Sequence, residues 1–374
     1  MTYNFFDLER DMRVAIFHDY FSTQGGGERV VQELGKIFHA DIFTTDIQIP
    51  ILKSNNFTIT SLGSIYSIPC LKQTSAAMRF FRSDFSHEYD LFIFSGNWAQ
   101  YAAYHNKPSI YYCQDAPVRA LYDQFPVYYS HLNTMYKPFF MTWAHFMRYF
   151  DQRTVKQVHT IVANSYKVST RVKQYYNRNS TVIYPPVETT KYLWKKNEKF
   201  WISVNRLYPE KQIELQIKIF SRIPDIELLI IGGRGTGDHS KEYGKQISNM
   251  IEDYPNIHLL GEISEEHLID LYSRCAGLIC TARDEAFGLA PIEAMASGKP
   301  VVAINSGGYL ETVPSECGRL VEPHIEELIS AVIDISEKSD AYHNCCIENA
   351  KKFDSAIFKD SFLQLAKKVI HNIS

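Results

Sequence analysis

The sequence lacks the cysteine patterns that stabilise small secreted domains or bind zinc. Its seven cysteines are scattered over 374 residues, no two of them form a C-x-x-C pair, and Cys345 and Cys346 are adjacent. Disulfide frameworks and structural zinc sites show paired cysteines, or cysteines and histidines, at short spacings. The sequence therefore predicts neither class, and it favours a reducing compartment, the cytoplasm.

Long apolar runs are absent as well. The longest run, residues 138–147, covers about half of the ~20 residues that a membrane-spanning helix requires. Residues 1–12 carry four charged side chains and no apolar core, so we expect no signal peptide. These absences predict a globular chain without a membrane-spanning segment.

The sequence also lacks an excess of charge of one sign. The net charge is −3, and 45% of the residues are hydrophobic and 22% charged, as in globular proteins. A chain so balanced is not expected to bind nucleic acid as its main activity. No D-x-D motif occurs, so we expect no divalent metal ion, and we expect no cofactor.

Short apolar runs alternate with longer helical patterns along the whole chain, which predicts parallel sheets wrapped by helices in an α/β fold. The predicted strands are 14–17, 91–94, 110–113, 160–163 and 181–184 in the first half, and 200–204, 228–231, 257–260, 277–280 and 301–304 in the second. A stiff segment, Y-P-P-V at 184–187, separates them. We therefore predict a first domain over 1–185, a second over 186–353, and a helix over 354–374.

The stretch over 283–308, RDEAFGLAPIEAMASGKPVVAINSGG, contains the most informative motif. Pro291 suits the first turn of a helix, so the N–H groups of the preceding residues would lie at its positive end and could bind a phosphate. These residues are Phe287, Gly288 and Leu289. Glu285 and Glu293 flank them, and carboxylates there would accept hydrogen bonds from hydroxyl groups. The pattern predicts a polyhydroxylated phosphate ester as ligand.

Two cations follow the first strand of the second half. Arg206 comes directly after that strand, and Lys211 follows five residues later, where a helix begins. Because cations are unfavourable at a helix N-terminus, we interpret this pair as binding a diphosphate. The glycines at 232–237 do not fit the G-x-G-x-x-G spacing of dinucleotide-binding proteins, so a dehydrogenase is the weakest alternative.

Polar residues also follow the predicted strands of the first half. His18 and Asp19 end the first strand, and three glycines at 25–27, including Gly26 and Gly27, would let the backbone approach a ligand closely. Gln114 and Asp115 follow the strand over 110–113. Ligands of such sheets bind at the carboxyl ends of the strands. The side chains at these strand ends are therefore candidates for a second site, although a lone histidine at a strand end is often structural. Gly26 and Gly27 are candidates for binding the donor.

The stretch 283–308, with FGL, SGKPVV and SGG in order, resembles the donor site of retaining glycosyltransferase family four, whose GT-B fold has two Rossmann-like domains facing each other across a cleft. The resemblance implies that Glu285 contacts the donor sugar and Glu293 the ribose. It assigns the diphosphate to Arg206 and Lys211, and it implies that Gly233 lies in a nucleotide-facing turn. The C-terminal helix would pack back onto the first domain.

Residues 18–34, HDYFSTQGGGERVVQEL, resemble the opening of a mannosyltransferase-like subgroup that builds polysaccharides and lipid-linked glycans. Relatives commonly carry histidine where this chain has Gln114, so the role of that histidine cannot be transferred. His18 is the nearest remaining histidine that could face the acceptor, with Asp19, Gln114 and Asp115 as further acceptor-binding candidates.

The resemblance implies a hexosyltransferase that uses a nucleoside diphosphate sugar as donor substrate, GDP-mannose as the first choice and UDP-hexoses next. The expected acceptor is a glycan or a lipid-linked glycan. Two alternatives remain open: a nucleotide-sugar epimerase or hydrolase of the same architecture, and a non-catalytic partner in a glycan-assembly complex.

The segment over 136–178 contains eight lysines or arginines and one acidic residue, Asp151, and it begins with the aromatic stretch PFFMTWAHFMRYF at 138–150. Aromatic and basic residues together suit the surface of an anionic membrane. They would then hold the enzyme at the inner face of the membrane. The alternative is a partly buried helix whose cations point to water.

Overall fold

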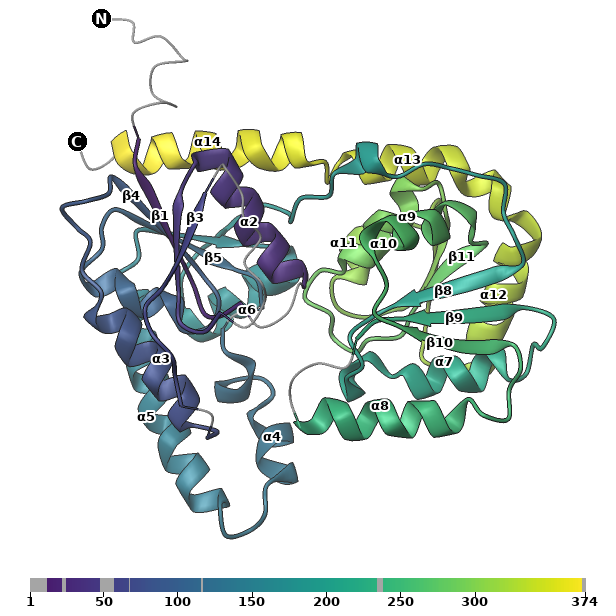
Figure 1. Ribbon diagram of the computed structural model, residues 1–374, viewed down its shortest axis with the longest axis horizontal. Coiled ribbons are helices and arrows are strands. Elements are labelled where there is room, and N and C mark those ends of the chain that lie inside the picture. Colours follow the sequence, from purple (N-terminus) through teal and green to yellow (C-terminus); the bar gives the residue numbers. More distant parts are fainter. Residues whose placement is uncertain are drawn as a thin grey trace, which may run out of the picture. The chain divides into compact units, whose positions relative to one another are not determined.

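The computed structural model describes residues 12–21, 25–47, 57–66, 68–115, 117–233 and 238–371, with the side chains of 238–241 outside the description. The chain divides into two compact units, one formed by Met1–Tyr184 with Lys359–Ser374 and the other by Pro185–Phe358 (Figure 1). The linker predicted at 184–187 and the helix predicted from 354 lie where the chain passes between these units.

The first unit contains a seven-stranded parallel sheet in the order β3-β2-β1-β4-β5-β6-β7. Its central strands are buried apolar runs, which is why the sequence predicts them. The strands are β1 Val14–His18, β2 Asp41–Thr44, β3 Thr58–Ser61, β4 Leu91–Ser95, β5 Ser109–Cys113, β6 Thr160–Ala163 and β7 Thr181–Val182. Strands β2 and β3 were not predicted from the sequence. Strand β3, TITS, lacks an apolar run because it is a largely exposed edge strand.

Helices flank this sheet: α2 Gly26–Phe38, α3 Leu71–Arg82, α4 Phe125–His131, α5 Lys137–Val155 and α6 Tyr166–Tyr176, with short 3-10 turns η1 Ala99–Tyr104 and η2 Arg119–Leu121. The last helix, α14, spans Ser355–His371, and from Lys359 onward it belongs to this unit. Its fully buried Phe362 packs edge-on against Tyr112 of β5, with ring centres 5.4 Å apart. The C-terminal helix thus covers part of the first sheet. Among the described residues, no helix is both long and apolar enough to span a bilayer.

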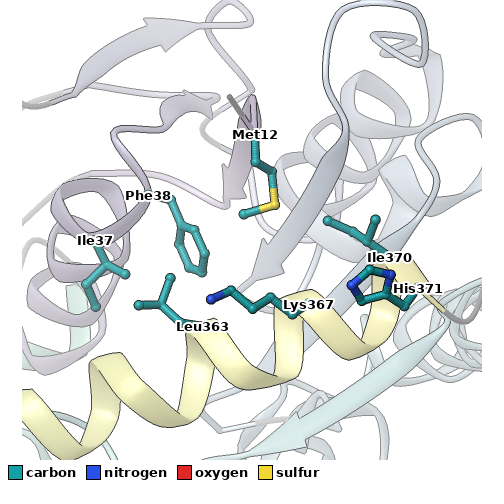
Figure 2. Close-up of a pocket in the computed structure, with 7 residues that line it drawn as sticks. All are labelled: Met12, Ile37, Phe38, Leu363, Lys367, Ile370 and His371. Atoms are coloured by element: carbon teal, nitrogen blue, oxygen red, sulfur yellow. The ribbon is translucent and has the colours of Figure 1, made fainter. Parts of the chain in front are cut away.

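A small pocket lies where α14 crosses the end of α2 (Figure 2). Its volume is about 40 Å³ and its lining is mainly apolar: Met12, Ile37, Phe38, Leu363, Lys367, Ile370 and His371. That volume is far below the ~300 Å³ at which pockets for small-molecule ligands begin. We interpret it as a packing gap beneath α14 and not as a substrate site.

The second unit contains a six-stranded parallel sheet in the order β10-β9-β8-β11-β12-β13. Its strands are β8 Phe200–Val204, β9 Glu227–Ile231, β10 Ile257–Gly261, β11 Gly277–Cys280, β12 Val301–Ile304 and β13 Gly318–Val321. Its helices are η3 Thr189–Lys191, η4 Pro209–Lys211, α7 Ile213–Phe220, α8 Asp238–Met250, α9 Glu265–Arg274, α10 Leu289–Ala296, α11 Tyr309–Thr312, α12 Ile325–Lys338, η5 Ser339–Tyr342 and α13 His343–Lys351. Only β13, which begins Gly-Arg, was missed among these strands.

The two sheets share a topological feature that positions a site. The first strand of each unit lies inside its sheet, with β1 between β2 and β4 and β8 between β9 and β11. The chain thus leaves to opposite sides of these strands, and ligands bind at the carboxyl ends of strands at such a switch point. The polar residues that follow β1, β4, β5, β8 and β11 are therefore the candidates for ligand contacts.

Candidate functional site

Two of the predicted residues of the second unit meet directly. The ammonium Nζ of Lys211, at the end of η4, lies 2.5 Å from Oε2 of Glu285, in the loop between β11 and α10. The side chains are 24% and 20% exposed, so a ligand can still reach them. An ion pair of this kind holds a cation and an acceptor of hydroxyl hydrogen bonds at one place on the carboxyl edge of the sheet.

The backbone around Lys211 is fixed by the neighbouring loop. Thr281 Oγ1 donates to the carbonyl oxygens of Lys211 (2.8 Å) and Gln212 (3.1 Å), and it accepts from Gln216 Nε2 at 2.8 Å. The Arg283 N–H donates to the Glu210 carbonyl at 3.0 Å. These bonds tie the turn after β8 to the loop after β11, so the position of Lys211 depends on both segments.

The two glycines of the SGG motif fix the loop that carries Glu285. The Gly308 N–H donates to the Glu285 carbonyl at 2.7 Å. Gly307 has φ +63°, and a Cβ there would lie 2.5 Å from the backbone N and O of Glu285. A Cβ at Gly308 would lie 2.5 Å from backbone atoms of Phe287. Only glycine allows the segment after β12 to approach this loop so closely.

Helix α10 begins with the arrangement expected for an anion site. Its N-cap is Gly288, with φ +93°, which has no side chain to accept the N–H groups of the first turn. Leu289 is the first helical residue, and Pro291 lies in the first turn. Phe287 is buried, and its ring packs edge-on against Phe353 at 5.6 Å. Phe287 thus anchors the start of the helix beside the Glu285 loop.

Glu293 lies in α10 and is only 3% exposed. Its Oε2 accepts a hydrogen bond from the Tyr272 hydroxyl at 2.9 Å. Burial raises the pKa of Tyr272 well above its usual range, and the nearby Glu293 carboxylate adds to that shift, so this phenol stays protonated and donates. The assignment of Glu293 to a ribose stays a prediction, and a ribose would share this carboxylate with Tyr272.

Arg206 and Gly233 follow the neighbouring strands β8 and β9. The Asn205 N–H donates to the Ile231 carbonyl (2.9 Å), and the Leu207 N–H to the Gly233 carbonyl (3.3 Å). These bonds place the exposed Arg206 beside the loop of Gly233. The rest of the predicted glycine turn, 234–237, lies outside the described residues. Both predicted residues are thus on the same edge as Lys211, and their ligand roles stay predictions.

Lys299 of the SGKPVV motif has a structural role. Its side chain is fully buried, and Nζ donates to the carbonyl of Lys195 at 2.8 Å and to Oδ1 of Asn197. Burial lowers the pKa of Lys299 to about 8. This lysine therefore secures the segment before β8 and is not exposed to a ligand.

In the first unit, His18 lies at the end of β1 and is 6% exposed. Its Nδ1 lies 3.0 Å from the Ser95 carbonyl oxygen, which can only accept, so the ring hydrogen is on Nδ1. The ring packs edge-on against Phe21, with centres 5.0 Å apart. His18 is thus oriented by β4, and its contact with an acceptor stays a prediction.

Asp19 binds the backbone of its own unit. Its carboxylate accepts from the N–H groups of Asn97 (2.6 Å), Trp98 (2.8 Å) and Ala99 (2.9 Å), at the start of η1. Burial raises the pKa of Asp19, the charge of His18 and the three N–H groups opposing that effect. Gly96 has φ +120°, and a Cβ there would lie 2.5 Å from the carboxyl carbon of Asp19. The carboxylate thus orders the turn after β4, a contact that was not predicted from the sequence, and the acceptor role of Asp19 stays a prediction.

Gln114 joins three segments at the same edge. Its Nε2 donates to Ser95 Oγ at 2.7 Å and to the Gly27 carbonyl at 3.2 Å. Gly26 and Gly27 form the first turn of α2, and a Cβ at Gly27 would lie 3.0 Å from Oε1 of Gln114. Gln114 therefore links the glycine turn to β4 and β5.

Asp115 lies in an ion-pair cluster with two arginines. Its Oδ1 is 3.2 Å from Nη1 of Arg171 and 3.9 Å from Nη1 of Arg119. Asp123 contacts the same arginines, at 3.2 Å from Arg119 and 3.5 Å from Arg171. The carboxyl group of Asp115 is 52% exposed, whereas Arg171 is buried. Asp115 thus combines an ion pair with access to solvent, and its acceptor role stays a prediction.

One group of reactive side chains was not predicted from the sequence. The sulfur atoms of Cys317, Cys345 and Cys346 all lie within 4.8 Å of one another, and all three cysteines are free. The spacing in sequence hides this cluster, because Cys317 is 28 residues before Cys345. Only the adjacency of Cys345 and Cys346 gives a signal, and it does not identify the third partner.

Comparisons with known proteins show which family and fold the chain resembles. Residues 187–353 match the family "Glycosyl transferases group 1". The chain is 31% identical over 153 residues to the α-1,3/1,6-mannosyltransferase ALG2 of Dictyostelium discoideum, covering 36% of each protein. It is 30% identical over 206 residues to the O-antigen chain mannosyltransferase RfbU of Salmonella typhimurium, covering 52% of this chain and 56% of RfbU. The alignments thus span between about a third and somewhat more than half of these curated relatives.

The structure of Anabaena Alr3699/HepE, solved in complex with UDP and glucose, superposes with a TM-score of 0.74 at 19% identity, covering 95% of this chain and 99% of that one. Identity at that level speaks for the fold alone. Two Rossmann-like α/β units with parallel sheets, as predicted, are confirmed, and the fold is GT-B. The resemblance to family-four mannosyltransferases is likewise confirmed.

Proposed function

Because residues 187–353 match the glycosyl transferases group 1 family, we propose that the protein is a retaining glycosyltransferase. It moves a hexose from a nucleoside diphosphate sugar to a hydroxyl group of a glycan or lipid-linked glycan. The observation that carries the proposal is the Lys211–Glu285 pair, 2.5 Å apart, in the same loop system as the glycine-capped start of α10. This arrangement offers charge to phosphates and a carboxylate to sugar hydroxyls.

Each group has a role that follows from its chemistry. Lys211 and Arg206 bind the diphosphate and stabilise its charge as it leaves, with the N–H groups at the start of α10 contributing. Glu285 accepts hydrogen bonds from the donor sugar. Retention follows if the acceptor hydroxyl attacks the face that the diphosphate leaves, and a phosphate oxygen then takes the hydroxyl proton. No protein nucleophile or metal ion is required by this scheme.

GDP-mannose is the donor we propose first. The support is the names of the relatives, since ALG2 and RfbU are both mannosyltransferases, and the resemblance of residues 18–34 to a mannosyltransferase-like subgroup. UDP-hexoses come second. Thermal unfolding in the presence of GDP, UDP and ADP sugars tests this, because a donor at about 100 times its dissociation constant stabilises the protein by about 2.7 kcal/mol. Equal increases in unfolding temperature with all three nucleotide sugars would show that the site does not select the base.

Product analysis then separates the alternatives. With donor alone, a transferase leaves the sugar attached to the nucleotide, an epimerase changes its configuration and a hydrolase releases it. With an acceptor present, only the transferase lengthens the glycan. A non-catalytic partner gives no product in either case, and that result would overturn the proposal.

We also propose that the first unit contacts an anionic membrane, at its cytoplasmic face, through α5 and its neighbours. The buried residues of α5, which include Ala144, Met147 and Asp151, recur at helical spacing and face the unit. The opposite side presents Phe139 (59% exposed), Phe146 (57%) and Tyr149. Large exposed rings at these positions are not needed by the core.

Neighbouring helices extend this apolar surface. Trp143 Nε1 of α5 donates to Thr74 Oγ1 of α3 at 2.9 Å, and Phe140 of α5 stacks on Phe125 of α4 at 5.5 Å. Figure 1 shows α3, α4 and α5 on the same side of the first sheet. The exposed apolar side chains of these helices, and of the segment between α4 and α5, include Leu71, Met78, Phe81, Val127, Tyr128, Met135 and Met141. Arginines lie among these side chains. The guanidinium of Arg153 lies 4.4 Å from the centre of the Tyr149 ring.

Vesicle sedimentation tests this contact. Binding should require anionic lipid and weaken as salt rises, because added salt screens surface charge. Arg153→Glu with Lys156→Glu should release the protein, and Phe146→Ser should weaken binding, while Tyr254→Ser, an exposed tyrosine of the second unit, should not. Arg148 is unsuitable for this test because its guanidinium donates to the Leu121 carbonyl. Equal binding to neutral and anionic vesicles, or none to either, would overturn the membrane proposal.

A further inference from the structure

We propose that Cys317, Cys345 and Cys346 form a binding site for a thiophilic d¹⁰ cation such as Zn²⁺ in the second unit. The proposal depends on the positions of three side chains and is independent of the transferase function proposed above. The three sulfur atoms lie within 4.8 Å of one another. Zinc–thiolate bonds of ~2.3 Å in a tetrahedral site put neighbouring sulfurs ~3.8 Å apart. A shift of about 1 Å would therefore bring the three sulfurs to coordination distance.

The backbone that carries Cys317 is fixed. Cys317 precedes β13, and its carbonyl accepts from the Val301 N–H of β12 at 3.2 Å. The next residue, Gly318, admits no side chain, because a Cβ there would lie 2.0 Å from the Val301 carbonyl oxygen. Cys317 is thus held at a fixed point beside the sheet, as a ligand residue of a preformed site should be.

The other two cysteines lie in the first turn of α13, which begins at His343. Their thiols donate only weak hydrogen bonds to backbone carbonyls: Cys345 to Glu316 (2.7 Å) and Tyr342 (3.0 Å), and Cys346 to Cys317 (3.6 Å). Cys317 donates in turn to the Cys345 carbonyl at 3.2 Å. Because the S–H group is a weak donor, replacing these three hydrogens with one cation forfeits little hydrogen bonding.

Access distinguishes this cluster from ordinary core cysteines. Cys317 and Cys346 are buried, but Cys345 is partly exposed, which gives a cation a route to the site. Among the described residues, no histidine or carboxylate joins the three sulfurs within the same distance. The fourth position of a tetrahedral ion would therefore be taken by water, and three thiolates with one open position suit zinc or cadmium.

The site would join two segments of the second unit, α13 and the segment before β13. Helix α13 contacts the region of α10 through Asn349, whose Nδ2 lies 3.1 Å from the Thr312 carbonyl and 3.4 Å from Met295 Sδ of α10. A cation bound by Cys317 and by the first turn of α13 would cross-link that helix to the segment before β13. Its role is therefore stabilisation of the second unit, and the metal does not take part in transfer.

The experiment uses the full chain, reduced with a phosphine, stripped with a chelator and then titrated with Zn²⁺ or Cd²⁺. We expect one cation per chain in native mass spectra, cadmium–thiolate charge-transfer absorbance, and a higher unfolding temperature. Cys345→Ser removes the partly exposed ligand and should lower affinity by at least about tenfold. Cys70→Ser, which changes a partly exposed cysteine of the first unit, should leave affinity unchanged.

Three results would overturn the proposal: no cation bound by the reduced protein, equal affinity in the Cys345→Ser variant, or an equal loss in Cys70→Ser. Retained turnover in a Cys345→Ser variant that no longer binds Zn²⁺ supports the structural role. Turnover measured in the parent protein and in both variants keeps this test separate from the transferase proposal. The transferase proposal fails only if none of the three proteins forms product.

Discussion

At the carboxyl edge of the first sheet, the carboxylate of Asp19 accepts hydrogen bonds from three backbone N–H groups of the same unit. At the corresponding edge of the second sheet, Glu285 pairs with the ammonium of Lys211, and both side chains remain partly exposed. The two sheets have the same switch-point topology, yet one edge uses its acidic residue to order a loop and the other keeps a charged pair within reach of a ligand. Position at a strand end therefore does not by itself assign a residue to a substrate.

The largest effect that we expect tests the charged pair. Lys211→Ala should lower turnover by about two to three orders of magnitude, the loss typical of one contact that stabilises transition-state charge. The fold should be nearly unaffected, because a partly exposed ion pair contributes ~1 kcal/mol or less to stability. Steady-state kinetics and thermal unfolding measure both, with Lys218→Ala, an exposed lysine of α7, as the control. Near-normal turnover of a folded Lys211→Ala protein would remove this edge as the donor site.

The next effect tests the opposite edge. Asp19→Ala leaves the N–H groups of residues 97–99 without their acceptor in a buried place, so the free energy of unfolding of the first unit should fall by about 3 kcal/mol. Asp115→Ala, at an exposed carboxyl group, should cost about 1 kcal/mol or less. Hydrogen exchange of the amides at 97–104 and urea unfolding measure the difference.

Donor binding supplies the control for that experiment, since the second unit carries the donor residues. It should be unchanged in both variants if they fold. A stable Asp19→Ala protein with normal exchange at 97–104 but no transfer to acceptor would reverse our interpretation. Asp19 would then be an acceptor-binding residue and not a structural one.

A third effect concerns the buried Asp151 of α5, which accepts from Tyr122 (2.7 Å) and Gln100 (2.9 Å). Burial raises the pKa of Asp151 to about 6, above the ~3.9 of an unfolded chain. Between these values the folded state binds more protons than the unfolded state, so this group lowers stability as pH rises from about 4 to 6. Above pH 6 the buried, ionised carboxylate lowers the free energy of unfolding by the full amount, roughly 2–3 kcal/mol.

Unfolding of Asp151→Asn and of the parent protein at pH 4.5 and 7.5 checks this sign. The free energy of unfolding of the variant, relative to the parent, should be higher at pH 7.5 than at pH 4.5, because the amide does not ionise. Glu88→Gln, at an exposed position of the same unit, should show no such change. A relative stability of Asp151→Asn that stays constant or falls as pH rises would contradict a raised pKa of Asp151.

The two edges also differ in how far the sequence predicts them. The buried strands β1, β4, β8, β11 and β12 are apolar runs and could be predicted from the sequence. The switch-point rule then brings the segments of Lys211 and Glu285 to one edge, 74 residues apart in the chain. The bonds of Asp19 could not be predicted, because its partners are backbone groups whose orientation depends on the turn at Gly96.

The same reason explains the other omissions. The edge strand β3 is short and largely exposed, and β13 opens with Gly-Arg, so neither gives an apolar run. The three cysteines meet only because the segment before β13 lies beside the first turn of α13, and the spacing of cysteines in the sequence does not predict that contact. Hydrophobic periodicity thus locates elements and motifs, whereas pairings between loops require the folded backbone.

The smallest expected effect is that of removing divalent ions. The donor edge pairs Glu285 with a lysine, and no D-x-D motif is present, so we expect the leaving diphosphate to be stabilised by Lys211, Arg206 and helix N–H groups. Initial rates should therefore be unchanged when EDTA is added at the start of the assay. Slow loss of a structural cation from the three cysteines would appear instead as a lower unfolding temperature, and it would be absent in Cys345→Ser. An immediate loss of turnover that Mg²⁺ or Mn²⁺ restores would mean that a divalent ion, and not Lys211, supplies most of the charge at this edge.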